Sequence, residues 1–200
     1  FADQLSQLND WLTLSGTESG ETVFPTPIPP LPPEGFVLGA SVQSAQLAAQ
    51  FNWHFIFAAH LNGDRALLRD VLSFWQTHSA RPTIVAVQVI VADSNDTAAQ
   101  LAENVQIWGV ELENGQRVTV ASEEQALAFA AQAGSPPRKI ARREQALLHG
   151  TAQEVMAKLN ALHTQFGIDE FIIDTPVAEG HARLTSLRLL AQAHNAVEVL

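Results

Sequence analysis

The 200-residue chain is 46% hydrophobic and 16% charged, which is ordinary for a globular domain and is enough for one substantial core. Its 21 acidic and 11 basic residues give a net charge of −10, which disfavours nucleic acid and anionic membranes as partners. The lack of cysteine excludes disulfides and thiolate metal sites and fits a cytoplasmic protein, and no apolar run approaches the roughly 18 residues of a membrane span.

Residues 1–14 predict a surface helix, because apolar side chains recur there at helical spacing. Residues 15–35 predict a connector, whose second part packs six prolines between Pro25 and Pro33 and therefore favours extended polyproline geometry. A ligand for an aromatic-lined groove is the alternative interpretation of this segment. Since the chain has no initiator Met and begins within a helical pattern, we expect a fragment or short form of a longer protein.

Residues 36–108 predict three strand–helix units in succession. The strands are 36–39, 55–58 and 83–92, and each is followed by a segment with helical apolar spacing. Between 109 and 150 this alternation is interrupted by a turn at Asn114-Gly115, a helix over 122–133 and a break at residues 134–137. Residues 151–200 then predict a last unit, in which Thr151 caps a helix, 171–173 form a strand and 181–194 form the final helix.

Continuously apolar strands that alternate with amphipathic helices predict an α/β fold with a parallel sheet buried on both faces. Four such units make half of an eight-stranded (β/α)8 barrel of the TIM type, which typically needs about 250 residues. A half-barrel leaves strand edges unpaired, so we expect association with a missing half or with a second copy.

Polar residues follow the strands, where ligands gather in parallel α/β folds. After the first strand, Gly39 permits a tight turn, and Ser41 and Ser44 lie three residues apart in the first turn of a helix. The free amide groups there, including that of Val42, together with the two hydroxyls can bind a phosphate. The alternative is that Ser41 only caps the helix.

The remaining strand-end residues have weaker interpretations. His60 is a candidate base, ligand contact or turn residue. Asp93 and Asp96 are typical of a helix start, whereas Asp174 and Thr175 fit either a turn or a pocket. No histidine spacing typical of metal sites occurs, so we expect no metal. The basic cluster Arg138, Lys139, Arg142 and Arg143 is interpreted as a solvated helix face.

An ordered set of short segments resembles the bacterial luciferase-like, flavin-dependent monooxygenases. The segments run from Phe36 to Ala49, from Phe55 to His60, from Val89 to Ser94, and from Gly150 through Val155 to Phe171. The resemblance extends over nearly the whole chain and implies a (β/α)8 barrel of which this chain is the C-terminal half, with residues 109–150 as an insertion before the last unit.

The resemblance also implies a site. Reduced flavin mononucleotide (FMN), or a deazaflavin in some branches, would place its phosphate on Gly39, Ala40, Ser41, Val42 and Ser44. Residues Phe57, Ala58, Ala59 and His60 would line the region near the flavin ring or substrate. The family's catalytic histidine has no counterpart here, so the catalytic residues are not identified.

We therefore expect a flavin-dependent monooxygenase that uses reduced flavin and oxygen on a small organic substrate. This chain would supply the flavin-phosphate loop. Two alternatives stay open: a non-catalytic flavin- or phosphate-binding half-barrel that dimerises, and a metal-dependent hydrolase on a barrel scaffold.

Overall fold

The computed structural model describes residues 1–13, 30, 31, 33–60, 64–105, 107–120, 122–143 and 146–197. Most of the connector predicted for residues 15–35 lies outside these ranges. The described chain divides into two compact units, one formed by residues 1–58, 64–85 and 168–170 and the other by residues 59–63, 86–167 and 171–200.

The first unit contains two parallel strands and three helices. They are α1 (Ala2–Thr13), β1 (Phe36–Gly39), α2 (Val42–Gln50), β2 (His54–Ala58) and α3 (Arg65–His78). Apolar side chains of α3 recur on one face and are buried, including Trp75, whose ring lies 5.6 Å from that of Phe55. The Trp75 indole N–H donates to the Pro82 carbonyl at 3.1 Å, so this large side chain is both packed and hydrogen-bonded. Helix α1 is tied to the unit by the Trp53 indole N–H, which donates to Asn9.

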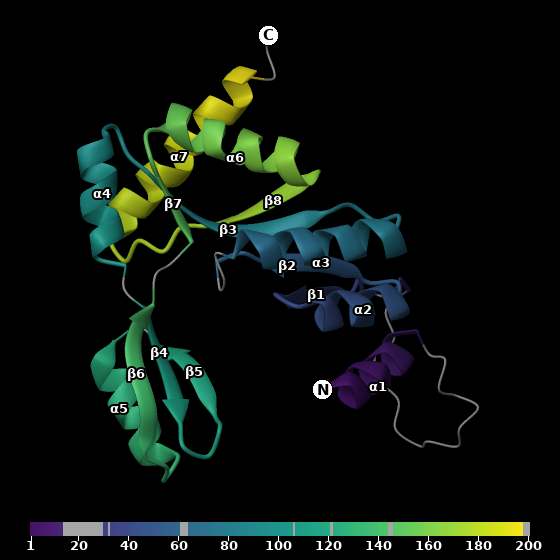
Figure 1. Ribbon diagram of the computed structural model, residues 1–200. Helices are drawn as coiled ribbons and strands as arrows, with labels where there is room; N and C mark the ends of the chain where they lie inside the picture. Colours follow the sequence, from purple (N-terminus) through teal and green to yellow (C-terminus); the bar gives the residue numbers. More distant parts are fainter. Residues whose placement is uncertain are drawn as a thin grey trace. The chain divides into compact units, whose positions relative to one another are not determined.

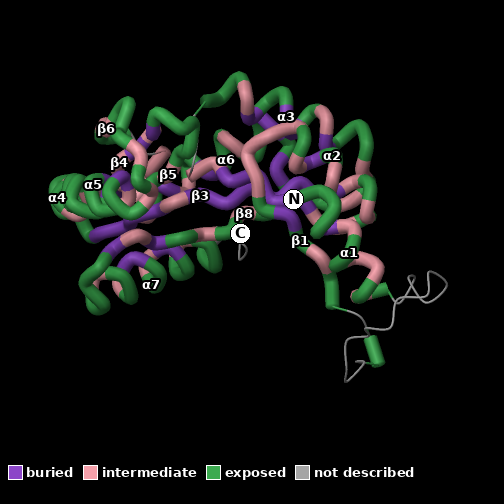
Figure 2. Tube along the Cα trace, turned by 90° about the horizontal axis from the view of Figure 1, so that it is seen from below, coloured by how far each residue is buried: buried purple, intermediate pink, exposed green. Residues whose placement is uncertain are grey.

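The second unit contains most of β3 (Ile84–Val91), a strand that is buried along nearly its whole length (Figure 2). Helix α4 (Asn95–Glu103) follows it, and β7 (Leu147–Gly150), α6 (Ala152–Phe166), β8 (Glu170–Asp174) and α7 (Gly180–Val197) complete the unit around the segment described below. The amide of Val91 donates to the buried Ser186 hydroxyl at 2.8 Å, which connects β3 to α7.

The principal sheet has the order β1-β2-β3-β7, with β8 also paired to β3. The β1–β2 and β3–β7 pairs are parallel. The amides of Asp169 and Glu170 donate to the Thr83 carbonyl, so β8 starts beside the start of β3, whereas β7 pairs with Gln88–Val91 at its end. This arrangement confirms an α/β fold with a parallel sheet.

Residues 107–143 form a small module, which we define by β4 (Ile107–Leu112), β5 (Arg117–Val120), α5 (Glu123–Gln132) and β6 (Pro137–Arg143). Its antiparallel sheet has the order β5-β4-β6, and α5 covers one face (Figure 1). Val110, Leu112, Ala126 and Ala130 form a separate buried core.

Two sequence-based expectations differ from the structure. Within residues 109–150, which are predicted as an insertion before the last unit, Leu147–Gly150 form β7, a parallel strand next to β3 that the sequence pattern did not indicate. The basic cluster from Arg138 to Arg143 lies on strand β6, not on a helix. Basic and apolar residues do not alternate regularly in this strand, and it begins with Pro137, a residue that is rare in strands. The sequence pattern therefore did not indicate a strand.

Candidate functional site

The site predicted after the first strand is the turn that joins β1 to α2. In the parallel register Gly39 pairs with Phe57, so the carboxyl ends of β1 and β2 reach the same edge of the sheet. Ser41 has extended backbone angles and is the N-cap of α2. The turn therefore presents the amino end of a helix at the edge of the sheet where ligands bind in parallel α/β folds.

The two serines predicted at this turn are in contact. The Ser44 amide donates to Ser41 Oγ at 3.2 Å, and the two hydroxyl oxygens lie 3.0 Å apart. The interpretation of Ser41 as the helix cap is thus correct. The cap does not use all of the hydrogen-bond donors at this turn. Each hydroxyl has one proton and their mutual bond uses one, so the other proton remains for a ligand. The amides of Val42 and Gln43 have no carbonyl partner within their own helix.

Gly39 is needed because the turn is tight. A Cβ atom at this position would lie 2.5 Å from both Cβ and Oγ of Ser44. A contact that short forces a displacement, and here the neighbour is the base of a short side chain that cannot swing away. Gly39 therefore permits Ser44 to fold back onto the end of β1 and contact Ser41.

Helix α2 differs electrostatically from the other described helices. Each of those has a carboxylate at its start, whereas the first turn of α2 contains no acidic residue. The carboxylates are Asp3 in α1, Asp64 before α3, Asp96 in α4, Glu123 and Glu124 in α5, Glu154 in α6 and Glu179 before α7. A helix start carries partial positive charge, which a nearby carboxylate offsets. Among the described helices, α2 is the one whose start has no such carboxylate.

Hydrogen bonds stabilise the anionic form of two of the carboxylates at the other helix starts. Hydrogen bonds from Asn95 and from the Thr151 amide lower the pKa of Glu154. The amides of Ala182 and His181 lower the pKa of Glu179 in the same way. At these two helix starts the backbone and side-chain donors thus stabilise a negative charge, and the first turn of α2 contains no acidic residue to take that role.

The start of α4 provides an internal comparison. Its cap has nearly the same geometry, with Ser94 Oγ 2.9 Å from Thr97 Oγ1 and the Thr97 amide donating to Ser94 Oγ at 3.2 Å. However, Asp93 and Asp96 flank this cap and repel an anion. Paired hydroxyls are therefore not sufficient for anion binding, and the charge around them separates the two helix starts.

The second predicted group consists of the last two residues of β2 and the two residues after it. Phe57 and Ala58 are completely buried, so in this structure their side chains are enclosed by protein. Ala59 and His60 are partly exposed, and the Ala59 amide donates to the Ala86 carbonyl. His60 Nδ1 is buried without a hydrogen-bond partner among the described residues, which leaves a polar ring atom for a ligand to satisfy.

The other strand-end residues singled out in the sequence are Asp93, Asp174 and Thr175, and the structure places each in a different environment. Asp174 accepts a hydrogen bond from Gln88 at 2.8 Å, and Asp93 is exposed beside the Ser94 cap. Thr175 is buried, and its hydroxyl has no partner within the described ranges. Sequence inspection did not single out Gln88, although it is the one polar residue in the apolar run of β3.

Within the described ranges, no three histidine, aspartate or glutamate side chains come close enough together to hold a metal ion. The described helices are also too short or too polar to cross a membrane.

Comparisons with known proteins agree with the predicted resemblance. No family model matches the chain. N-acetyl-S-alkylcysteine monooxygenase of Bacillus subtilis strain 168 is 29% identical over 199 residues, which cover 96% of this chain and 59% of that protein.

Solved structures share the fold at lower identity. Apo-MsnO8 superposes with a TM-score of 0.66 at 21% identity, over 97% of this chain and 60% of its own. Monooxygenase RslO1 from Streptomyces bottropensis gives a TM-score of 0.57 at 17% identity, over 90% and 54% of the two chains. The chain thus spans a little over half the length of these proteins.

Proposed function

We propose that this chain, a relative of the luciferase-like, flavin-dependent monooxygenases, supplies the flavin-phosphate site of such an enzyme. The observation that carries the proposal is the start of α2. Its two paired serines lie in a helix turn without acidic residues, whereas the other described helices begin at a carboxylate. The relatives that match along the chain are named monooxygenases, which supports an oxidative enzyme.

The residues present fit the phosphate of FMN. The remaining hydroxyl proton of the Ser41–Ser44 pair and the amides of Val42 and Gln43 are donors in the first turn of one helix, whose start adds positive potential. Gly39 and Ala40 keep the approach free of bulky side chains. When bound, reduced flavin supplies the electrons that activate oxygen for transfer to a small organic substrate.

For the flavin ring we propose the last two residues of β2 and the two residues after it. Of the four predicted there, Ala59 and His60 are accessible in part, and His60 has a buried ring nitrogen without a described partner. A polar atom of the ring system or of the substrate would satisfy it. A deazaflavin cofactor would need a phosphate site as well. We therefore keep a deazaflavin as the alternative cofactor.

The sheet surface supports a requirement for further protein. Phe36 and Leu38 on one face of β1 are 49% and 56% exposed, and β1 pairs only with β2 among the described strands. We infer that a missing N-terminal half-barrel covers this face, as half of a TIM-type barrel would need. A second copy of the chain, pairing as a homodimer, is the alternative.

The phosphate assignment is tested by comparing FMN with riboflavin, which has the same ring and no phosphate. Both are titrated into the purified chain by fluorescence quenching. We expect FMN to bind more tightly than riboflavin. The double variant Ser41→Ala/Ser44→Ala should weaken FMN binding about tenfold to a hundredfold, the range for losing a charge-assisted hydrogen bond, and leave riboflavin unchanged.

The matched control is Ser94→Ala/Thr97→Ala, which removes the same pair of hydroxyls from the start of α4. This control should bind FMN as the unaltered chain does. Equal affinity for FMN and riboflavin in the unaltered chain, or equal losses in the two double variants, contradicts the assignment.

A further inference from the structure

A hollow of about 660 Å³ lies where the module joins the rest of its unit. One wall is apolar and comes from Ala99, Ala102 and Val105, at and after α4, together with Leu147 of β7. The side chains of Arg142 and Arg143, at the end of β6, line it as well. None of these residues belongs to the serine turn, so the hollow is a second site with its own chemistry.

The residues that line this hollow come from the parts of the chain just before and just after the module, and from the end of the module itself. Val105 and Ile107 flank one connection to the module, while Arg143 and Leu147 flank the other. Arg143 pairs with Ile107 in the antiparallel sheet, and Leu147 pairs with Gln88 in the parallel sheet. Strand pairing thus orders Arg143 within the sheet of the module and Leu147 within the principal sheet, and both residues line the hollow.

The two arginines have no anionic partner in the described part of the chain. Arg117 and Arg138 of the same module both pair with Glu111, at 3.0 and 3.6 Å. By contrast, no described carboxylate lies within 4.0 Å of Arg142 or Arg143, although Glu103 also lines the hollow. In a chain with a net charge of −10, two adjacent unpaired guanidinium groups are a localised attraction for an anion.

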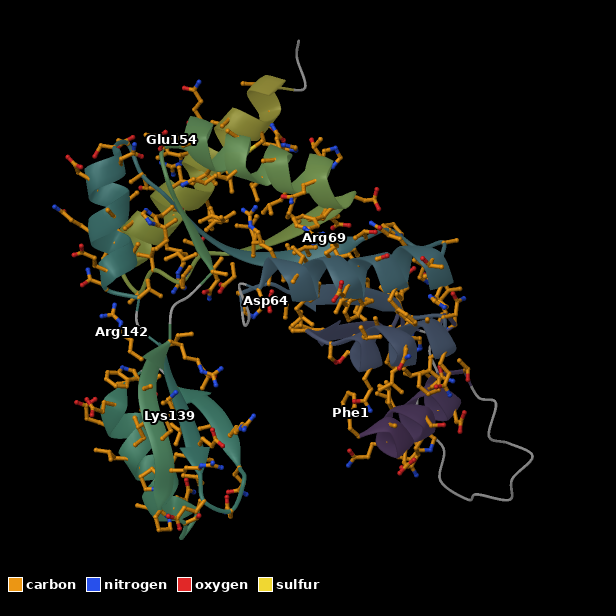
Figure 3. The ribbon with its side chains drawn as sticks, viewed as in Figure 1. Phe1, Asp64, Arg69, Lys139, Arg142 and Glu154 are labelled. Carbon is orange, nitrogen blue, oxygen red and sulfur yellow. The ribbon has the colours of Figure 1, made fainter. Side chains whose placement is uncertain are left out.

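The absence of a side chain at Gly109 leaves room for the guanidinium group of Arg143. A Cβ atom at Gly109 would lie 2.3 Å from Nε and 3.0 Å from Cζ of Arg143. The Arg143 guanidinium therefore lies against the backbone of β4, in space that only a glycine leaves open. Figure 3 shows Arg142 at the end of β6 nearest α4, whereas Lys139 lies further along the strand.

A neighbouring hollow of about 530 Å³ has the opposite character. It shares Ala99 and His149 with the first but is lined by the carboxylates of Asp96 and Glu154. The single cation there, Lys158, already donates to the His149 carbonyl at 2.7 Å. The preference for an anion is therefore confined to the end next to Arg142 and Arg143.

We propose that the hollow beside Arg142 and Arg143 binds a small organic carboxylate with an aliphatic body. The carboxylate would accept hydrogen bonds from the guanidinium groups, whose planar donors match its two oxygens. The aliphatic part would pack on Ala99, Ala102, Val105 and Leu147. This wall distinguishes the ligand from inorganic phosphate, which the same arginines would attract but which gains nothing from apolar contact.

The test uses pentanoate as the probe, with the full chain observed by ¹H–¹⁵N NMR at constant ionic strength. We expect saturable shifts at Gly109, Arg142, Arg143, Ala99 and Ala102, with a dissociation constant on the order of millimolar for so small a ligand. Pentanamide, which is neutral and of the same size, and inorganic phosphate should each bind about tenfold more weakly. Equal binding by either one, or no saturable shift, overturns the proposal.

Variants separate charge from position. Arg142→Gln and Arg143→Gln should each weaken pentanoate about tenfold, whereas Arg138→Gln, on the same strand but paired with Glu111, should not. Gly109→Ala keeps every charge but displaces the Arg143 guanidinium, so it too should weaken binding. The rest of each spectrum reports whether the variant is folded. Equal losses in Arg138→Gln and Arg143→Gln, or an unaltered affinity in Gly109→Ala, would count against a built site.

Discussion

At the scale of single residues, carboxylates at helix starts stabilise this chain, and Glu154 is a clear example. Its side chain accepts from Asn95 Nδ2 at 2.9 Å and from the Thr151 amide at 3.3 Å, within a capping box. The Asn95 side chain also accepts from the Thr151 amide at 3.1 Å, so α4 and α6 begin at one hydrogen-bonded junction.

The lowered pKa of Glu154 predicts how this junction responds to pH. The folded-state pKa lies below 4.5, so the stabilisation is present above pH 4.5 and is lost as the pH falls through the folded-state value. We expect Glu154→Gln to lower the melting temperature at pH 7 and to have a smaller effect at pH 3, because protonation of the carboxylate removes part of this stabilisation as the pH falls. Thermal unfolding followed by circular dichroism at both values measures this.

Glu103→Gln serves as the control, since it removes one charge from the end of α4 without a described hydrogen bond. It should not reproduce the pH dependence of Glu154→Gln. A melting-temperature difference for Glu154→Gln that is the same at both pH values would show that the charge of the carboxylate has no part in the junction.

Individual site residues could be predicted from sequence to different degrees. Gly39, Ser41 and Ser44 were recognisable because a turn, a cap and a helix start leave a local pattern. What distinguishes α2 from the similar Ser94–Thr97 cap is the charge around it, which becomes informative only once all helix starts are known. Arg142 and Arg143 were recognised as a basic cluster, but the hollow that they line together with residues of α4 and β7 is formed by parts of the chain far apart in the sequence, which no local pattern reports.

At the scale of elements, the long periodic segments were predictable and the short ones were not. The amphipathic α3 and α6 and the apolar β3 each span enough residues for their period to be visible. Strand β7 has four residues, and β6 has three basic residues and a proline among its first six. The formation of these two strands depends on partners that lie far along the chain, so tertiary pairing outweighs local preference.

Because the module has its own core, we expect it to unfold separately from the principal sheet. Leu112 is 1% exposed in a core that the module does not share with the principal sheet. Leu112→Ala should therefore cost about 2–5 kcal/mol of module stability. Hydrogen exchange measured by mass spectrometry should show faster exchange in β4, β5 and β6 and unchanged exchange in β3 and α6.

Leu127→Ala is the matched control, because it makes the same truncation on the 54% exposed face of α5. It should leave exchange in the module as it was. Faster exchange throughout the chain in Leu112→Ala would show instead that the module and the principal sheet unfold together.

At the scale of the whole molecule, net charge and exposed apolar surface act in opposite directions. A net charge of −10 keeps copies apart, whereas the exposed Phe36 and Leu38 on the edge strand β1 favour burial against a partner. Salt screens the repulsion over a Debye length of about 8 Å at physiological ionic strength and leaves the apolar attraction. If β1 is an interface for a second copy, association should strengthen as salt rises.

Sedimentation velocity at micromolar concentration, in low and high sodium chloride, measures this association. If a second copy binds at β1, we expect the unaltered chain to sediment faster at high salt. Leu38→Glu should remain a monomer at both salt concentrations, because burying its charge would oppose association more strongly than the apolar contact favours it. Leu127→Glu adds the same charge to an exposed leucine of α5 and should associate as the unaltered chain does.

Association that weakens with salt would instead identify a contact between the basic β6 and the acidic remainder of another copy. A monomer under all conditions would leave a separate N-terminal half, added as its own polypeptide, as the partner that covers Phe36 and Leu38.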